Sequence, residues 1–349
     1  GVRAVCELAS AITPSAMRRA MRVSYLFALV LLQPATAFSQ EPALKPAHSR
    51  PAVRAGAASA VLPTLRGGDA KMAMGPLATS AAILGAANAV GFGISVATNW
   101  HYHLDLIGTG IFAVSAVLVR GAGLVQQLSA GAVSLWSVKL ASFLFYRVLQ
   151  TKRDARLEGL LATTSGAASF WFVSFLWAFV VSLPHTVAAT VPAAAQPALG
   201  AVTVAGLALF GAGLSLETAA DVQKWLFKAD AANAGRFCDA GVWKLTQHPN
   251  WFGNLLLWTG IFVMNMPALA ARVPGTAGWQ RVARLAAAAV CPLFLWRLFS
   301  AQASGAMLDA AAQAAAKYEG VAGFKEYVEA TPLLVPTMRS VRVWLRGGA

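Results

Sequence analysis

The sequence predicts an all-α integral membrane protein, a polytopic bundle of about six to eight transmembrane helices. Apolar residues make up 57% of the 349-residue chain, and charged residues make up only 12%. A soluble globule of ordinary composition would need more polar surface than this. Apolar stretches recur along the chain, separated by proline, glycine and charged residues, and several approach the ~20 residues that a helix needs to cross a bilayer.

The N-terminal segment has the pattern of a secretory signal peptide. Residues 1–16 precede the first methionine, Met17, and we expect them to be untranslated run-on. After Met17 come three arginines, an apolar core at 25–32 and a small-residue cleavage site at 35–37. The apolar core is too short to span a bilayer comfortably.

Phe38 follows the cleavage site and begins a segment, up to residue 70, that is rich in Ala, Ser and Pro and poor in acidic residues. A signal peptide followed by such a segment resembles the bipartite plastid presequence of algae with secondary red plastids. We therefore expect residues 1–70 to be a presequence and the mature protein to reside in a plastid membrane. The alternative is an endoplasmic-reticulum or secretory leader with a polar tail.

Residues 71–349 are predicted to form one membrane domain. Small residues are dense in its apolar stretches and would let helices approach closely. The polar segments between these stretches are short enough to be loops or caps over a single core. The candidate spans are residues 77–98, 106–120, 130–150, 168–184, 198–216, 252–268 and 284–300.

Charge and cysteine patterns exclude several classes of function. The formal net charge is +14, but the basic residues are scattered between apolar spans, which favours membrane flanks over a nucleic-acid surface. The three cysteines lie far apart and form no CxxC pair, so we predict neither a metal site nor a disulfide framework. The absence of a P-loop and of a G-x-G-x-x-G motif argues against a Rossmann nucleotide site.

A ladder of ionisable residues continues the span that ends near residue 216. Glu217, Asp221, Lys224 and Lys228 fall on one helix face about 60° wide. A strip of salt bridges at a membrane boundary, worth ~0.3 kcal/mol per exposed pair, is the structural alternative to a binding site.

A second polar cluster, in the stretch GVWKLTQHPNWFGNLLLW at 241–258, introduces the next apolar helix. We expect Asn250 to be the N-cap of that helix and Gly253 to open space beside its backbone. A helix N-terminus with a histidine and lysines nearby suits a phosphate group. A plain cap would not explain His248.

Taken in order, these motifs resemble the uncharacterised-domain branch of the steroid 5-alpha-reductase superfamily. Its pattern runs E-x-x-x-D-x-Q, then Phe-Lys, then G-L-W, then R-H-P-N-Y-x-G-E, and this chain has ETAADVQ, FK, GVW and QHPNWFGN in the same order. Upstream, WSVKLASFLFYRVLQTKRDARLE is similar to the family's W-x-x-R-L segment with its later Arg and D-x-R. The C-terminal FKEYVEATPLLVP continues the likeness, which covers about residues 105–336.

The resemblance implies a membrane reductase with NADPH in a cavity formed by the C-terminal helices and their cap, at about residues 200–340. Cationic side chains there would neutralise phosphates, polar ones would hold amide or ribose groups, and tryptophans would enclose the nicotinamide. The residues that it implies as cofactor-binding are Arg147, Arg156, Glu217, Asp221, Gln223, Lys228, Trp243, His248, Asn250, Gly253 and Tyr327.

The chain departs from the family pattern at five positions. Gln247 replaces Arg and removes a bidentate phosphate donor, and Asn254 replaces Glu and removes an acceptor. Trp251 replaces Tyr, Lys139 replaces Arg and Ser174 replaces Gln. These departures leave the cofactor preference and the retention of activity open.

The implied reaction passes a hydride from NADPH to a conjugated carbon–carbon double bond in a steroid, terpenoid or other lipid. A protein acid must protonate the other end, and Tyr146 and Asp105 are the candidates. The structural alternatives are an interfacial anchor for Tyr146 and a first-turn acid for Asp105. The expected partners are the lipid bilayer and a hydrophobic small-molecule substrate, with no nucleic acid.

Two other functions remain open at the level of sequence. The membrane isoprenylcysteine methyltransferases share an R-H-P-x-Y-x-G-E-like motif and bind S-adenosylmethionine, so a methyltransferase is one alternative. The E-x-x-x-D-x-Q ladder favours the reductase branch over it. A non-catalytic membrane scaffold is the other alternative, because Gln247 and Asn254 replace charged family residues.

Overall fold

The structure is a computed structural model that describes residues 74–152, 157–305 and 310–346. The predicted presequence at 1–70 and the predicted cofactor residue Arg156 lie outside the described residues. Every regular element in the described part of the chain is a helix.

Six of the helices are long and apolar enough to cross a membrane. An additional helix, α4, is apolar but shorter, and all seven predicted spans overlap one helix each. The predicted fold class is confirmed: the chain forms a polytopic membrane helix bundle. The bounds of the seven helices are α3 Pro76–Thr98, α4 Leu104–Val119, α5 Leu124–Thr151, α7 Thr164–Ala188, α8 Ala201–Ala229, α9 Pro249–Leu269 and α10 Gly278–Ala303.

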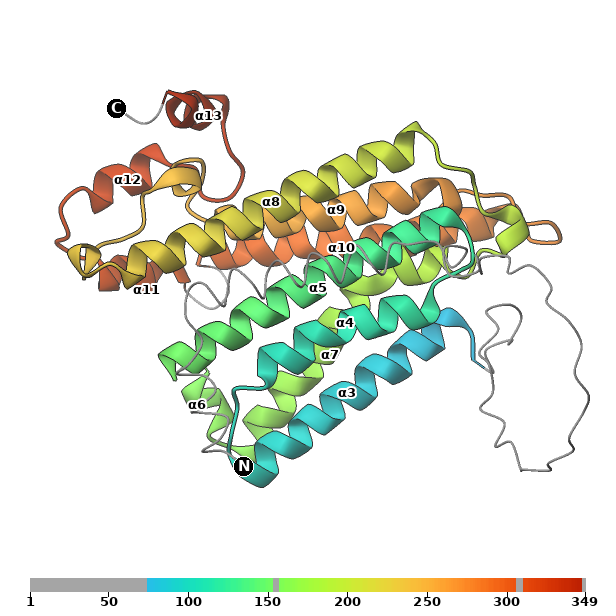
Figure 1. The fold of residues 1–349 in the computed structure, drawn as a ribbon, viewed down its shortest axis with the longest axis horizontal. Coiled ribbons are helices and arrows are strands. Elements are labelled where there is room, and N and C mark those ends of the chain that lie inside the picture. Colours follow the sequence, from blue (N-terminus) through green and yellow to red (C-terminus); the bar gives the residue numbers. More distant parts are fainter. Residues whose placement is uncertain (1–73, 153–156, 306–309, 347–349) are drawn as a thin grey trace, which may run out of the picture.

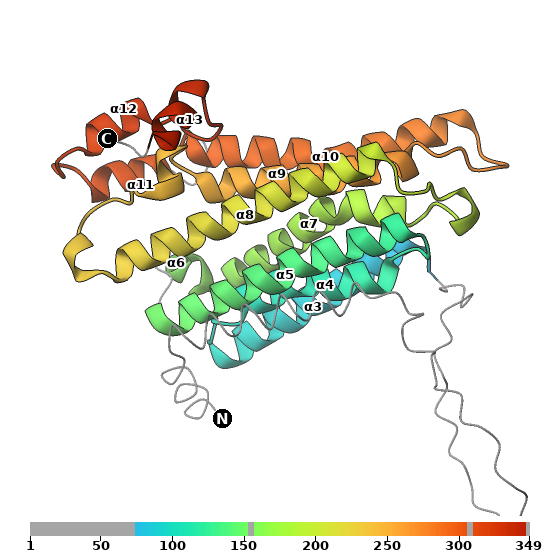
Figure 2. The ribbon, with the colours of Figure 1, turned by 45° about the horizontal axis from the view of Figure 1, so that its top comes forward.

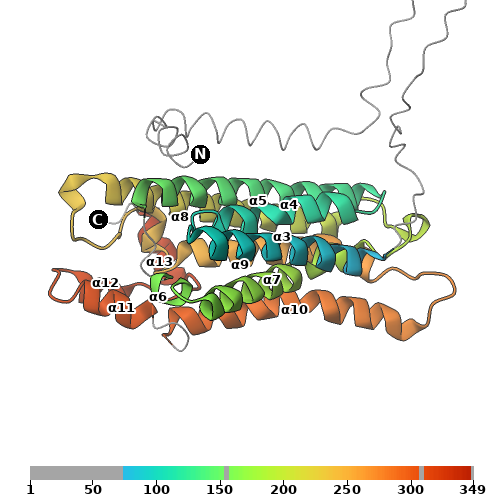
Figure 3. The same cartoon turned by 90° about the horizontal axis from the view of Figure 1, so that it is seen from below.

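The helices lie side by side and alternate in direction, so that α3, α5, α8 and α10 all end at the same end of the bundle (Figures 1 and 2). We call this the cap end, because the short C-terminal helices gather there (Figure 3). A 3-10 turn, η2 (Ala193–Ala195), lies in the connection at the opposite end. The cap end carries α6 (Glu158–Leu161), η3 (Ala231–Asn233), η4 (Gly241–Lys244), α11 (Ala310–Lys317), α12 (Phe324–Ala330) and α13 (Met338–Leu345).

Helices α8 and α9 pack backbone against backbone, through glycines spaced seven residues apart. A Cβ at Gly206, Gly213 or Gly260 would collide with the backbone of the facing helix. At Gly253 it would lie 2.6 Å from the backbone nitrogen of Glu217. Small residues at such an interface let two helices approach closely, which is the usual way for membrane helices to associate. Gly253 therefore serves this contact, and the space beside it is filled by α8.

The apolar core lies between α4, α5 and α9 and is centred on aromatic rings. The Trp136 ring meets the Trp258 ring edge-on with centroids 4.9 Å apart, and Phe112 lies 5.2 Å from Trp136. All three side chains are fully buried. Outward-facing apolar residues such as Phe172 and Leu293 are exposed, as expected of helix faces that meet lipid.

Candidate functional site

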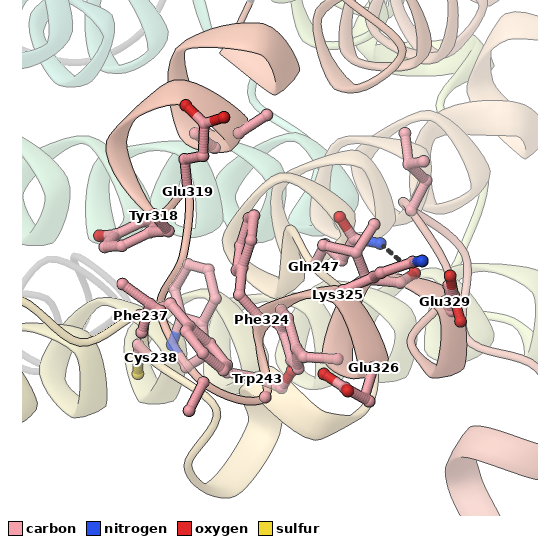
Figure 4. Close-up of a pocket in the computed structure, with 18 of the residues that line it drawn as sticks. Phe237, Cys238, Trp243, Gln247, Tyr318, Glu319, Phe324, Lys325, Glu326 and Glu329 are labelled. Carbon is pink, nitrogen blue, oxygen red and sulfur yellow. Dashed lines mark hydrogen bonds between the residues drawn. The ribbon is translucent and has the colours of Figure 1, made fainter.

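A pocket of about 700 Å³ opens at the cap end (Figure 4). The end of α8, the segment 237–248, α11 and α12 form its walls. Three of the predicted cofactor residues, Trp243, His248 and Tyr327, line it. Its wall also includes Lys224, Phe237, Cys238, Gln247, Tyr318, Phe324 and Lys325.

Trp243 is fixed from three sides. Its indole Nε1 donates to the Ala220 carbonyl oxygen at 3.0 Å, and its own carbonyl accepts from the Tyr327 hydroxyl at 2.9 Å. The Lys224 ammonium lies 4.2 Å from the centre of the Trp243 ring, a cation–π distance. Burial raises the pKa of Tyr327 above its usual value, so this hydroxyl stays a hydrogen-bond donor.

Gln223 holds the η4 turn against α8 and lies outside the pocket wall. Its side-chain Oε1 accepts from the Val242 backbone N–H at 2.8 Å. Gly241 begins the turn at φ +55°, and a Cβ there would lie 2.6 Å from the Gln223 Cδ. The left-handed backbone and the pressing side chain both require glycine at this position.

His248 is the N-cap residue of α9, and its side chain does not cap the helix. The prediction of Asn250 as N-cap is wrong: Pro249 takes the first helical position, so Asn250 lies within the first turn. The His248 ring stacks on Trp251 with centroids 4.1 Å apart and planes 9° apart. Desolvation, assisted by nearby Lys224, lowers the pKa of His248 to about 4. At neutral pH the ring is uncharged. The charged side chains that line the pocket are Lys224, Lys325, Glu319, Glu326 and Glu329.

Lys228 does not line the pocket, but it holds a wall residue in place. Its ammonium donates to the Arg236 carbonyl oxygen and, at 3.2 Å, to the hydroxyl of the wall residue Tyr318. Of the charged ladder on α8, the residue on the pocket wall is thus Lys224.

Below the pocket, Glu217 is buried in a network that joins α5, α8 and α9. It accepts hydrogen bonds from Lys139 at 2.5 Å, from Asn254 at 2.7 Å and from the Trp136 indole at 3.3 Å. Asp221 lies 4.0 Å from the same Lys139 ammonium. Two departures from the family pattern, Lys139 and Asn254, therefore meet at one carboxylate and both donate to it. We call this set the Glu217 network.

Two buried atoms at the Glu217 network lack a hydrogen-bond partner in the described structure. They are the Oδ1 of its member Asn254 and the Nε1 of Trp258, whose ring packs on Trp136. The two residues are one helical turn apart on α9. Buried polar atoms are nearly always paired, so an unpaired acceptor and an unpaired donor are an unusual feature of this part of the bundle.

The predicted proton donors, Tyr146 on α5 and Asp105 on α4, both lie at the cap end. The Tyr146 ring meets Trp225 of α8 edge-on with centroids 5.7 Å apart. The next residue on α5, Arg147, is half-buried near the helix end. Asp105, in the first turn of α4, borders a second hollow of about 380 Å³ together with Trp100 and His101. The structure therefore brings neither Tyr146 nor Asp105 to the larger pocket.

Gln247 joins the pocket to the C-terminal segment. Its backbone N–H donates to the Pro332 carbonyl at 2.9 Å, and its side chain donates to the carbonyls of Thr331 at 2.7 Å and Val328 at 3.1 Å. At the position where the family pattern has Arg, this chain thus has a residue that holds α12 in place.

Comparison with known proteins places this arrangement in a family. The model of the family described as "Protein of unknown function (DUF1295)" matches residues 91–331, which is more than half of the chain. The chain belongs to the DUF1295 family. That family is associated with steroid 5-alpha-reductase-like proteins. No curated protein and no solved structure matches the chain.

The DUF1295 match includes most of the pocket wall, and also residues that sequence reasoning did not assign to a site. Phe237 lies 5.3 Å from Phe324, 5.0 Å from Tyr327 and 6.2 Å from Tyr318 between ring centroids. The available signal was the gathering of these aromatics in two otherwise polar segments. Lys224 carried a signal as well, since it shares the helix face of Glu217 and Asp221.

Proposed function

We propose that this DUF1295 membrane protein is an NADPH-dependent reductase that acts on a conjugated carbon–carbon double bond of a steroid, terpenoid or other lipid. The observation that carries the proposal is the cap-end pocket, in which Lys224 lies over the Trp243 ring directly above the buried Glu217 network. Its volume of about 700 Å³ falls in the range usual for sites that bind small molecules and cofactors.

The pocket residues fit a dinucleotide in two respects, and in one respect they oppose it, because Glu319, Glu326 and Glu329 also line the wall. Lys224 and Lys325 offer ammonium groups for phosphates, and Trp243, Phe237 and Phe324 offer ring faces for flat heterocycles. Neutral His248 has one donor and one acceptor nitrogen, so it can donate a hydrogen bond to an amide or hydroxyl group or accept one from it. When bound, the reduced nicotinamide supplies a hydride for the electron-poor carbon of the double bond.

The protein would contribute position, exclusion of water and a proton. Apolar and aromatic walls keep water from the reacting atoms. The proton donor in this proposal is Tyr146 or Asp105. Because neither residue lines the pocket, the lipid would have to extend from the pocket to α5 or α4 to meet it. The Glu217 network would hold α5, α8 and α9 at fixed spacing beneath the cofactor.

Thermal unfolding of the detergent-solubilised protein with NADPH, NADH and S-adenosylmethionine tests the proposal, because a ligand that binds the native state raises the unfolding temperature. We expect a rise with NADPH. The converted lipid should gain two hydrogens, one of them deuterium when NADPH is labelled at nicotinamide C4. A rise with S-adenosylmethionine and transfer of its methyl group would identify a methyltransferase instead. No rise with any of the three would favour a scaffold.

The proposal includes a plastid membrane as the location, because the resemblance of residues 1–70 to a bipartite presequence supports it. A fluorescent fusion of the full chain should enter the plastid, and Phe38→Ala should divert it to the endomembrane system. Unchanged plastid import of the variant would count against the bipartite presequence. An endomembrane signal from both chains would indicate a secretory leader instead.

A further inference from the structure

The last helix of the described chain, α13, exposes both arginines and large apolar side chains. Met338 is 71% exposed and Leu345 is 70% exposed. Arg339, Arg342 and Arg346 are exposed as well. A capping box formed by Thr337 and Ser340 secures the start of the helix, so the exposed side chains project from a defined element.

The exposed residues of α13 are sorted around the helix. At 100° per residue, the three arginines fall within a sector about 60° wide, and Met338 and Leu345 adjoin one edge of it. Ser340 is buried, and Val341 packs against the protein. A basic stripe bordered by apolar side chains is the pattern of helices that lie in a membrane interface, with apolar groups in the acyl region and arginines at the phosphates.

The depth of α13 matches the bilayer boundary. Val341 packs on the cluster around Trp243 that includes Ala220 and Leu216 of α8. This is the level at which the apolar run of α8 gives way to its charged ladder. Leu334, four residues before α13, belongs to the apolar core of the bundle. The helix therefore begins close to the membrane core and lies where lipid headgroups would be.

The direction of α13 is also that of an interfacial helix. It runs across the axis of the bundle beside the C-terminal part of α8, and is seen nearly end-on in Figure 1 and from the side in Figure 3. Because the long helices cross the membrane, a helix that runs across them lies along the membrane surface.

We propose that α13 binds the anionic headgroups of the leaflet at the cap end and thereby anchors the cap to the membrane surface. Charge complementarity selects lipid phosphates for the three arginines. The contact of Val341 with the Trp243 cluster connects this anchor to the pocket wall. The inference rests on α13 alone and does not depend on the reductase proposal.

An environment-sensitive maleimide dye on Leu345→Cys reports the position of α13 in the full chain. Cys6→Ser removes the cysteine outside the described residues, while Cys238 and Cys291 are buried. The protein is placed in nanodiscs of phosphatidylcholine, with or without phosphatidylglycerol, and brominated lipid serves as quencher. The same chain without Leu345→Cys, treated with the same dye, gives the background from non-specific labelling.

We expect phosphatidylglycerol to increase quenching and to reduce the access of water-soluble quenchers. Combined Arg339→Gln, Arg342→Gln and Arg346→Gln should abolish this lipid dependence, with the ratio of buried to exposed dye falling roughly fivefold per arginine. The matched triple Arg→Lys variant should retain it. Equal dye accessibility in both lipids would overturn the proposal. Protection that appears only when two copies share a nanodisc would overturn it in favour of a contact between chains.

Discussion

Two buried polar networks lie at opposite ends of the same bundle, and they differ in charge and in completeness. At the cap end, the Glu217 network holds the carboxylate of Glu217 and the ammonium of Lys139, and two unpaired atoms lie at Asn254 and the adjoining Trp258. At the other end, a network of uncharged amide, hydroxyl and imidazole groups joins α4, α5, α7 and α9. We call it the His185 network.

The His185 network forms one directed chain of hydrogen bonds. Gln126 donates to the Asn265 side-chain oxygen at 2.9 Å, and Asn265 donates to the Ser129 hydroxyl at 2.8 Å. His185 Nε2 must donate to the Ala116 carbonyl at 2.9 Å, because a carbonyl can only accept. His185 Nδ1 is then the acceptor for the Ser129 hydroxyl, at 2.9 Å.

The comparison separates a structural role from a functional one. A fully satisfied neutral network stabilises one packing of the helices and offers nothing to a ligand. A charged network with an unpaired donor and an unpaired acceptor is expensive to keep in a membrane protein, which is where functional groups are expected. The Glu217 network lies beneath the pocket, and the His185 network lies far from it.

The largest effect is expected from Glu217→Gln. It leaves the Lys139 ammonium buried beside a neutral amide, which should lower the free energy of unfolding by about 3 to 5 kcal/mol. Chemical unfolding in detergent measures the loss. Glu217→Gln with Lys139→Gln should recover part of it, because the buried ammonium is then gone, while Asp221 loses the cation that lies 4.0 Å away. Equal losses in the single and double variants would show that the two charges are not coupled.

His185→Ala should cost about 2 kcal/mol of stability, since it leaves the Ser129 hydroxyl and the Ala116 carbonyl without their partner. The same unfolding measurement detects this change. The rise in unfolding temperature caused by NADPH should be the same as in the unmodified chain. A smaller rise would contradict the division between a structural and a functional network.

Lys224→Gln should affect NADPH binding and not stability. It should weaken NADPH binding roughly tenfold, or about 1.4 kcal/mol, the scale of one lost charge-assisted contact. Stability without ligand should change little. Lys317→Gln on α11 is the matched control, since Lys317 is a nearby cation outside the pocket wall. Equal weakening in both variants would indicate a general charge effect and not a contact in the pocket. Titration of the purified protein with NADPH gives the two affinities.

The smallest effect is a dependence of stability on pH. The folded-state pKa of His248 is about 4, below the usual value of 6.5. The unfolded chain therefore binds a proton more readily, so stability is full above pH 6.5 and falls as the pH decreases toward 4. Between pH 6 and pH 5 the loss should be about 1 kcal/mol. His248→Phe keeps a ring against Trp251 and should remove this part of the pH dependence. An unchanged pH profile would assign the effect to other groups.

The helices were predictable because apolar runs and their breaks are local properties of the sequence. The span predicted to end near residue 216 lies on α8, and this helix continues through the ladder to Ala229. Its last three turns carry the charged ladder, which lowers hydropathy without interrupting the helix. Hydropathy therefore marks the membrane boundary along α8, and not the end of the helix.

The candidate site was predictable only in part, because it depends on how helices face one another. The sequence places Glu217, Lys224 and Lys228 on one face, but the structure gives them three different surroundings. Lys139, which meets Glu217, lies 78 positions away in the chain. The rotation of α5 against α8 and the folding of the cap, which decide these contacts, leave no local pattern in the sequence.

The glycine contacts between α8 and α9 have a mechanical consequence. Because the two backbones touch along the bundle, neither helix can tilt or slide without overlapping the other. The pair therefore moves as one rigid unit. The cap-end termini of α8 and α9 form one side of the pocket. The opposite side, residues 314–329, is held by hydrogen bonds of Gln247, Tyr327 and Lys228, and by the turn near Pro332. Weakening these few hydrogen bonds should therefore loosen that side of the pocket and leave α8 and α9 in place.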